Sequence, residues 1–371
     1  MVLKKYSNLA YIEPIMTPID LHRIAQSNDT LTKEHALDLL SDTYSVWDIM
    51  SAAYWPRKRY YANQVRIHIL NNSQNGHCPE DCHYCVQSKD SKVPIEKYGK
   101  KEADQLIQEA GEAYKNGAFR YCMVFSGRGP SKKRVAFLSD VIKKIKETYP
   151  IEVCLSPGLL SREDAKELAA AGLDRYNHNL NTSEGYYNSI CTTHTYHDRL
   201  ETLENVSHHN INICSGMIVG MGESHNDIVD VAFKLKELKV ISIPINFYLY
   251  MAGNTLGPKP PITPVDACKI VGLFRLINPQ AEIRLAAGRE AYLQHLQPMA
   301  LMAANSLFAE GYLNITGSGV IDTINLIESS GFTVDSHVDL SLFRDQQKTL
   351  ASLQRYNKTE LNLKTKAELK A

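Results

Sequence analysis

A chain of 371 residues, 44% apolar and 22% charged, has the composition of a folded globular protein, which excludes a fibrous repeat and disorder of the whole chain. Its 41 basic residues balance its 41 acidic ones, so charge favours neither nucleic acid nor an anionic membrane as a partner. No stretch approaches the roughly 18 apolar residues of a membrane span, and no apolar run follows Met1. We therefore expect a cytoplasmic protein that acts on a small molecule.

Both ends of the chain differ in pattern from its middle. Residues 1–60 predict a helical extension, with helices at about 31–41 and 46–54, which we expect to plug the bottom of the main domain. Residues 336–371 predict a polar tail, because the lysines after about residue 345 stand among polar residues without an apolar face. We assign the tail no function.

Between these ends, in residues 61–335, short β-rich runs alternate with segments of helical period. Such alternation is typical of βα units that build a parallel sheet, and eight units predict an α/β fold of the (β/α)8 TIM-barrel type. The expected strands are 65–70, 120–125, 152–156, 175–180, 212–219, 242–250, 282–286 and 306–313.

The segments between the strands carry the marks of helices that cover a barrel. Apolar residues recur at three- and four-residue spacing in segments 101–118, 132–147, 195–209 and 263–277. Ser161, Ser224 and Thr263 are each followed three residues later by an aspartate, which is a capping pattern that marks where a helix begins. We therefore expect one catalytic domain rather than two.

Eight cysteines are too few for a disulfide scaffold of this length, and in a reducing compartment they remain available to metals or catalysis. Three of them crowd into one short segment, Cys78-Pro-Glu-Asp-Cys82-His-Tyr-Cys85, just after the first expected strand. The other five stand singly in the chain: Cys122, Cys154, Cys191, Cys214 and Cys268. This distribution predicts one metal site in the three-cysteine segment and a different role for cysteines elsewhere in the chain.

The three-cysteine loop favours an iron-sulfur cluster. Such clusters are usually held by four thiolates, and a four-iron cluster with three protein ligands keeps one iron open, the position at which radical enzymes bind S-adenosylmethionine. Zinc with His77 or His83 as a fourth ligand is the alternative, although structural zinc sites more often use paired Cys-x2-Cys units. Tyr84 stands at a loop position where radical enzymes have an aromatic residue close to the adenine ring. The alternative interpretation is a tyrosine that only packs against its neighbours.

A second set of ligands falls within the expected strands. Cys122, Cys154 and Cys214 lie in the second, third and fifth strands, and Arg284 lies in the seventh. A single strand cysteine is usually a small buried hydrophobe, but three in one barrel are harder to explain in this way. An arginine inside a barrel needs an anionic or electron-rich partner. These four residues therefore predict a second site inside the barrel.

From about residue 60 to 335 the chain resembles the biotin synthase family of radical S-adenosylmethionine enzymes. The resemblance is carried by the loop, by the strand contexts of the four interior residues and by four further stretches: Gly172-Leu-Asp-Arg-Tyr-Asn-His-Asn-Leu180, Thr192-Thr-His-Thr-Tyr196, Pro244-Ile-Asn246 and Ala303-Ala-Asn-Ser306. It implies a [4Fe-4S] cluster on Cys78, Cys82 and Cys85, and a [2Fe-2S] cluster on Cys122, Cys154, Cys214 and Arg284 that donates sulfur. It also implies that Asn179 and Asn246 contact substrate and that Asn181 lies near the ribose, whereas turn formation or backbone capping is the alternative for these asparagines.

The function implied by the resemblance is insertion of sulfur into dethiobiotin to give biotin, with an electron donor such as flavodoxin or ferredoxin, in a homodimer. The sequence departs from the common family pattern at Asn181, where many members have aspartate, at His194, where arginine is common, and at 124–129. Cys191 and Cys268 match no ligand position and are expected to be ordinary thiols. A radical enzyme that donates no sulfur and a metal-stabilised barrel without turnover are the alternative functions.

Overall fold

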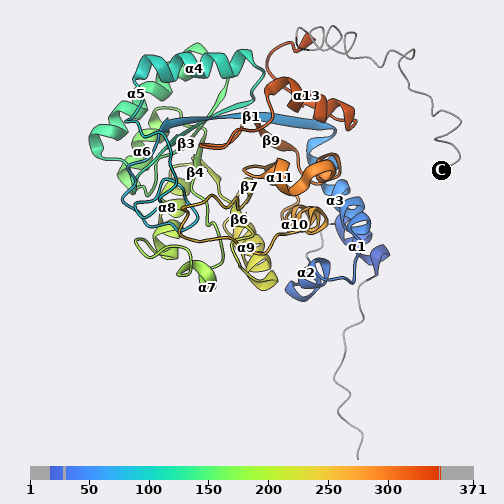
Figure 1. Cartoon of the computed structure of the whole chain (residues 1–371). Helices are drawn as coiled ribbons and strands as arrows, with labels where there is room; N and C mark the ends of the chain where they lie inside the picture. Colours follow the sequence, from blue (N-terminus) through green and yellow to red (C-terminus); the bar gives the residue numbers. More distant parts are fainter. Residues whose placement is uncertain (1–16, 28–30, 342, 344–371) are drawn as a thin grey trace, which may run out of the picture.

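The computed structural model describes residues 17–27, 31–341 and 343. The segment after residue 345, predicted as a polar tail, lies outside these residues. All strands join one sheet in which every ladder is parallel, in the order β10-β1-β2-β3-β4-β5-β7-β8-β9, and pairing of β9 with β1 closes it into a barrel (Figure 1). The predicted eight-unit α/β barrel is therefore confirmed.

The strands lie where the alternation predicted them, with shifted ends. They are β1 (Gln64–Gln74), β2 (Arg120–Phe125), β3 (Glu152–Ser156), β4 (Arg175–Asn177), β5 (Asn212–Cys214), β6 (Met217–Val219), β7 (Ser242–Phe247), β8 (Glu282–Leu285), β9 (Ser306–Ala309) and β10 (Thr333–Asp335). β10 was not predicted and pairs in parallel with the amino end of β1, at Gln64–Arg66. The expected strand 212–219 is broken into β5 and β6, because Gly216 lies directly against the backbone of Pro244 in β7.

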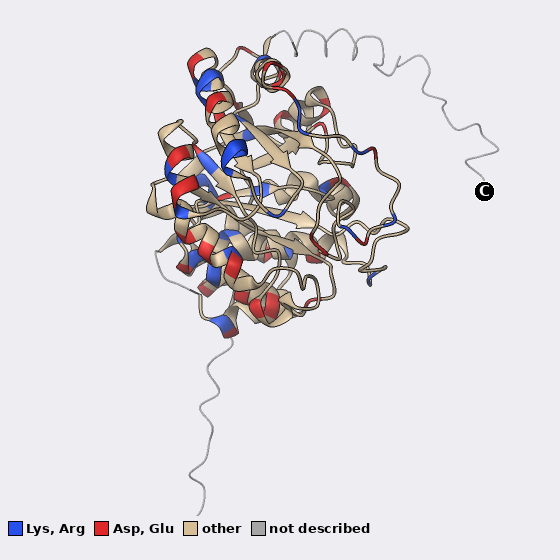
Figure 2. Ribbon diagram, turned by 90° about the vertical axis from the view of Figure 1, so that its left-hand side faces the viewer, with Lys and Arg blue, Asp and Glu red and all other residues tan. Residues whose placement is uncertain are grey.

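Helices surround the barrel as expected, with charged residues of both signs interspersed along them (Figure 2). They are α4 (Ala103–Lys115), α5 (Lys132–Thr148), α6 (Arg162–Ala170), α7 (Glu184–Tyr187), α8 (Tyr196–His208), α9 (His225–Glu237), α10 (Pro264–Ile277), α11 (Arg289–Leu293), η1 (Gln294–Leu296), α12 (Gln297–Ala300) and α13 (Val320–Ser329). The three predicted caps are confirmed, because Ser161, Ser224 and Thr263 each accept a hydrogen bond from the backbone three residues later.

The amino-terminal extension consists of α1 (Pro18–Gln26), which was not predicted, α2 (Lys33–Leu40) and α3 (Val46–Tyr61). α3 is longer than the expected helix at 46–54 and runs past Pro56 to Tyr61. α2 and α3 pack against α10 on the outside of the barrel, α2 also contacts α9, and α1 packs on α3 (Figure 1). α3 fits closely to α10, where a Cβ atom on Gly272 would lie 2.7 Å from Ile49. The carboxyl end of α3 reaches the amino ends of the strands, where Arg57 donates to the backbone oxygens of Gln64 at 2.9 Å and Ala304 at 3.4 Å. None of the described helices has the length and apolarity of a membrane span.

Candidate active site

The three-cysteine loop leaves the carboxyl end of β1, at the face of a parallel barrel where active sites are built. Cys82 is buried and Cys78 and Cys85 are half-buried. Burial raises the pKa of the Cys85 thiol to about 11, and the neighbouring Cys78 contributes to this rise. Since metal ligands must be thiolates, a metal bound here would have to displace the protons of these buried sulfurs.

Two carboxylates hold the loop in place. Asp81 accepts hydrogen bonds from the backbone N–H groups of Thr192 (2.9 Å) and Thr193 (3.2 Å). Burial alone would raise the pKa of the Asp81 carboxyl, but these bonds outweigh burial and hold that pKa well below its usual range. Glu80 accepts from Nδ1 of His194 at 2.6 Å and pairs with Arg128 at 3.2 Å. His194 and Arg128 of segment 124–129, where the sequence departs from the common family pattern, thus both bind the Glu80 carboxylate.

The histidines considered as zinc ligands are placed less favourably. Nδ1 of His83 lies 3.1 Å from the backbone oxygen of Ser189, so this nitrogen is engaged with the backbone. His77 is exposed. The loop therefore offers sulfur ligands, and neither of its two histidines is well placed to complete a zinc site. Such a ligand set fits an iron-sulfur cluster better than a zinc site with four protein ligands.

A cavity of about 250 Å³ opens beside the loop and brings together all four residues predicted to contact S-adenosylmethionine or substrate. Tyr84, Asn179, Asn181 and Asn246 line it, and Cys85 lies at its wall. Nδ2 of Asn181 donates to the Tyr84 hydroxyl at 2.6 Å. Asn181 has a left-handed backbone (φ 69°), a conformation that asparagine adopts more easily than most residues. The loop and the asparagine segment therefore share one pocket.

The alternative for the asparagines, backbone capping, is also realised. Oδ1 of Asn179 accepts from the N–H of Gly216 at 3.1 Å. Asn246 donates to the backbone oxygen of Met217 at 3.2 Å and accepts from the N–H of Ala287 at 3.3 Å. These two side chains thus fix the pocket wall as well as line the pocket.

Sequence reasoning missed two further residues of this pocket, His178 and Arg199. Burial holds the pKa of His178 well below its usual range, so its ring is neutral, and Nε2 has no hydrogen-bond partner among the described residues. Arg199, on α8, donates to the backbone oxygen of Asn179 at 2.8 Å. The run Asn177-His178-Asn179 was a usable signal for His178, whereas Arg199 carried none in the sequence.

The four interior residues also come together. Cys122 and Cys154 are paired neighbours on β2 and β3, and Cys214 lies on β5, the second strand along from β3 in the sheet. All three are buried and line or adjoin a cavity of about 20 Å³ with Arg284 in its wall. Nη1 of Arg284 lies 3.7 Å from Sγ of Cys214, and Nε of Arg284 has no partner among the described residues. Three sulfurs and an unsatisfied guanidinium N–H fit the predicted second cluster.

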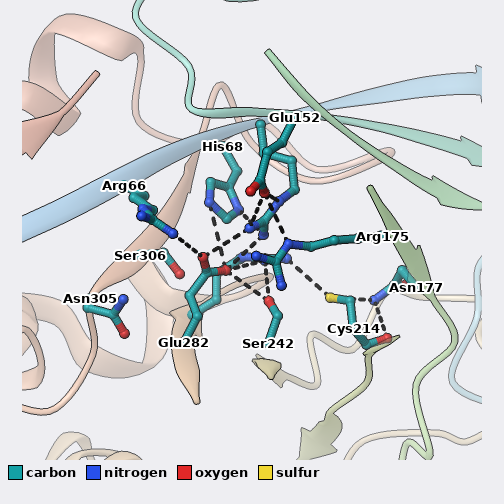
Figure 3. Close-up of polar contacts among 12 residues, drawn as sticks. Arg66, His68, Glu152, Arg175, Asn177, Cys214, Ser242, Glu282, Asn305 and Ser306 are labelled. Carbon is teal, nitrogen blue, oxygen red and sulfur yellow. Dashed lines mark hydrogen bonds and ion pairs between the residues drawn. The ribbon is translucent and has the colours of Figure 1, made fainter. Parts of the chain in front are cut away.

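A layer of buried polar and charged side chains, including His68, Arg175 and Glu282, lies beside Cys214 inside the barrel (Figure 3). Glu282 pairs with Arg284 at 2.6 Å and with Arg120 at 2.8 Å. Burial alone would raise the pKa of the Glu282 carboxyl, but the two arginines outweigh burial and hold that pKa well below its usual range. Burial and both arginines likewise lower the pKa of His68, so its imidazole is neutral. This layer fixes the guanidinium of Arg284 toward Cys214.

The two sites lie on either side of the same space. Val124, Ser156, Asn177 and Tyr312 line both the larger cavity next to the loop and the smaller cavity among the interior cysteines. A small molecule in the larger cavity would therefore lie between two separate sets of sulfur ligands.

Family models match residues 75–235 as the radical SAM superfamily and residues 244–333 as the biotin and thiamin synthesis associated domain. The chain is 49% identical over 311 residues to the biotin synthase of Magnetococcus marinus, covering 84% of this chain and 95% of that relative. It is 50% identical over 304 residues to the biotin synthase of Leptospira biflexa, covering 82% and 86%. The chain belongs to the biotin synthase family. Membership confirms the expected radical S-adenosylmethionine enzyme, and with it a [4Fe-4S] cluster as cofactor.

Solved structures with low sequence identity agree on the barrel. Methylornithine synthase superposes with a TM-score of 0.74 at 16% identity, over 88% of this chain and 99% of that one. The [FeFe]-hydrogenase maturase HydG of Carboxydothermus hydrogenoformans gives the same TM-score at 15% identity, over 86% and 80%. At such identities the likeness concerns the fold alone.

Proposed function

We propose that this chain converts dethiobiotin to biotin by inserting a sulfur atom taken from an interior [2Fe-2S] cluster. The observation that carries the proposal is the pair of cysteine sets on either side of one pocket. In this proposal Cys78, Cys82 and Cys85 hold the [4Fe-4S] cluster, and Cys122, Cys154, Cys214 and Arg284 hold the second one. When bound, the first cluster supplies the electron that cleaves S-adenosylmethionine and the second supplies the sulfur.

The protein's own groups orient the reactants and protect the reaction. Tyr84 and Asn181, joined by their hydrogen bond, form the wall for the nucleoside, and Asn179 and Asn246 form the wall for dethiobiotin. Arg284 brings a positive charge to the Cys214 sulfur, which must be a thiolate in order to bind iron. The buried strands around both cavities exclude water from the reacting groups.

A radical enzyme that donates no sulfur has no use for three interior cysteines beside a buried arginine, so the interior set favours sulfur insertion over this alternative. We further propose residues 1–60, 61–335 and 336–371 as the extension, the catalytic domain and the tail. A flavodoxin or ferredoxin as the electron donor, a homodimer and a cytoplasmic location complete the proposal.

Anaerobic reconstitution followed by assay of dethiobiotin conversion tests the function. Cys154→Ala is expected to lower the iron content from about six to about four per chain and to abolish biotin formation, because one ligand of the sulfur-donating cluster is gone. Cys268→Ala is the matched control, since it removes a buried thiol from α10 away from both sites. Biotin formed at an undiminished rate by Cys154→Ala would exclude the interior cluster as the sulfur source.

Asn181→Asp tests the nucleoside contact. Restoring the aspartate that is common in the family is expected to tighten binding of S-adenosylmethionine about fivefold, because a carboxylate accepts stronger hydrogen bonds from hydroxyls than an amide does. Aspartate tolerates the left-handed backbone of this position as asparagine does. Equilibrium dialysis with the reconstituted protein measures the change, and exposed Asn188→Asp in the same segment is the control. Unchanged or weaker binding would argue against a ribose contact at residue 181.

A further inference from the structure

Cys191, expected from the sequence to be an ordinary thiol, lies against the three-cysteine loop. Its Sγ is 3.7 Å from Sγ of Cys82, a residue 109 positions earlier in the chain. Both side chains are buried. The backbone holds the contact in place, because the N–H of His83 donates to the oxygen of Ile190 at 2.8 Å. A second sulfur is thus fixed beside a proposed cluster ligand without being part of the three-cysteine motif.

A mononuclear metal site made of Cys82, Cys191 and His194 is the first candidate explanation, since their ligand atoms lie within 4.8 Å of one another. The hydrogen bonds of His194 disfavour it. Nε2 of His194 accepts from Nη2 of Arg199 at 2.8 Å, so the ring proton is on Nδ1, which donates to Glu80 at 2.6 Å. Both ring nitrogens are therefore occupied, and the imidazole has no lone pair to offer a metal.

The Cys191 thiol faces two acceptors, the Asp81 carboxylate and the Cys82 sulfur. Oδ1 of Asp81 lies 3.3 Å from Sγ of Cys191. That oxygen already accepts from the N–H groups of Thr192 and Thr193, at 2.9 and 3.2 Å. Cys82 bound to iron must have lost its proton, so its sulfur can then only accept. The Cys191 S–H therefore donates to the Asp81 oxygen at 3.3 Å, and the Cys82 sulfur at 3.7 Å becomes a second acceptor for it once Cys82 is a thiolate.

We propose that Cys191 is a positioning residue that makes the loop cluster easier to reduce, through a hydrogen bond from its thiol to the Cys82 sulfur. Reduction adds negative charge to the cluster and its sulfur ligands, and a hydrogen bond to one of them stabilises that charge. Cys191 touches neither substrate nor nucleoside in this proposal. The inference rests on the proposed function, because it requires Cys82 to be a cluster ligand.

The test is the reduction potential of the loop cluster, followed by electron paramagnetic resonance in reconstituted protein without S-adenosylmethionine. Cys191→Val, which keeps the bulk and removes the donor, is expected to lower the ratio of reduced to oxidised cluster about tenfold at a fixed solution potential, equivalent to about 59 mV for one electron. Cys191→Ser keeps a donor and is expected to stay within about twofold of wild type. Cys268→Val removes a buried thiol in α10 and is the control.

The inference would be overturned if the reduction potential of the loop cluster were unchanged in Cys191→Val. It would also be overturned if Cys191→Ser lowered the potential as much as Cys191→Val does, because the loss would then not depend on the hydrogen-bond donor. Cys191→Ala is measured in parallel, so that poor packing of valine cannot decide the result. Failure of the proposed function is seen separately, as wild-type protein that takes up neither iron nor sulfide at the loop.

Discussion

Glu282→Gln is expected to lower the free energy of unfolding by about 3 to 5 kcal/mol, the usual cost of removing one partner from a buried ion pair. Glu282 is 2% exposed and pairs with Arg120 and Arg284, which are equally buried. Glutamine would leave two buried guanidinium charges without their shared carboxylate. Thermal or denaturant unfolding of the cluster-free protein measures this loss.

The same substitution is expected to reduce iron uptake at the interior site, since Arg284 loses the contact that orients it toward Cys214. Glu237→Gln is the matched control, because Glu237 is an exposed helix residue paired with Lys234 and its loss should cost less than about 0.5 kcal/mol. A Glu282→Gln protein as stable as that control would show that the buried charge layer does not support the barrel.

Gly216→Ala should destabilise the protein by about 3 kcal/mol or more, at or above the upper end of ordinary overpacking. A Cβ atom at this position would lie 1.9 Å from the backbone oxygen of Pro244, and backbone atoms cannot rotate away as a side chain can. The segment between β5 and β6 would have to move away from β7. Gly216 also exchanges hydrogen bonds with Asn179 and Asn181, so the pocket would be displaced as well.

The melting temperature and the affinity for S-adenosylmethionine are both expected to fall in Gly216→Ala. Gly99→Ala is the control, because Gly99 is exposed and no atom lies within 4 Å of a Cβ built there. If Gly216→Ala and Gly99→Ala had the same melting temperature, the fold would not require the close approach of residue 216 to Pro244.

The ends of the helices and strands show where the local sequence no longer predicts the structure. Segment 212–219 reads as one strand by its composition, and only its contact with β7 explains the break at Gly216. α3 continues past Pro56, although proline usually ends a helix. Packing against α10 outweighs this local preference, and that packing depends on which helices are neighbours in the folded chain.

The sequence by itself predicted the barrel, which the structure confirms, because strand and helix periods are local. It also predicted the two candidate ligand sets, one from cysteines spaced within one loop and one from residues within the expected strands. Only the tertiary structure decided which distant residues support them. Cys191 reaches Cys82, His194 and Arg128 meet at Glu80, and Glu282 orients Arg284. These contacts join separate strands and loops, so they follow from the register and closure of the sheet rather than from spacing along the chain.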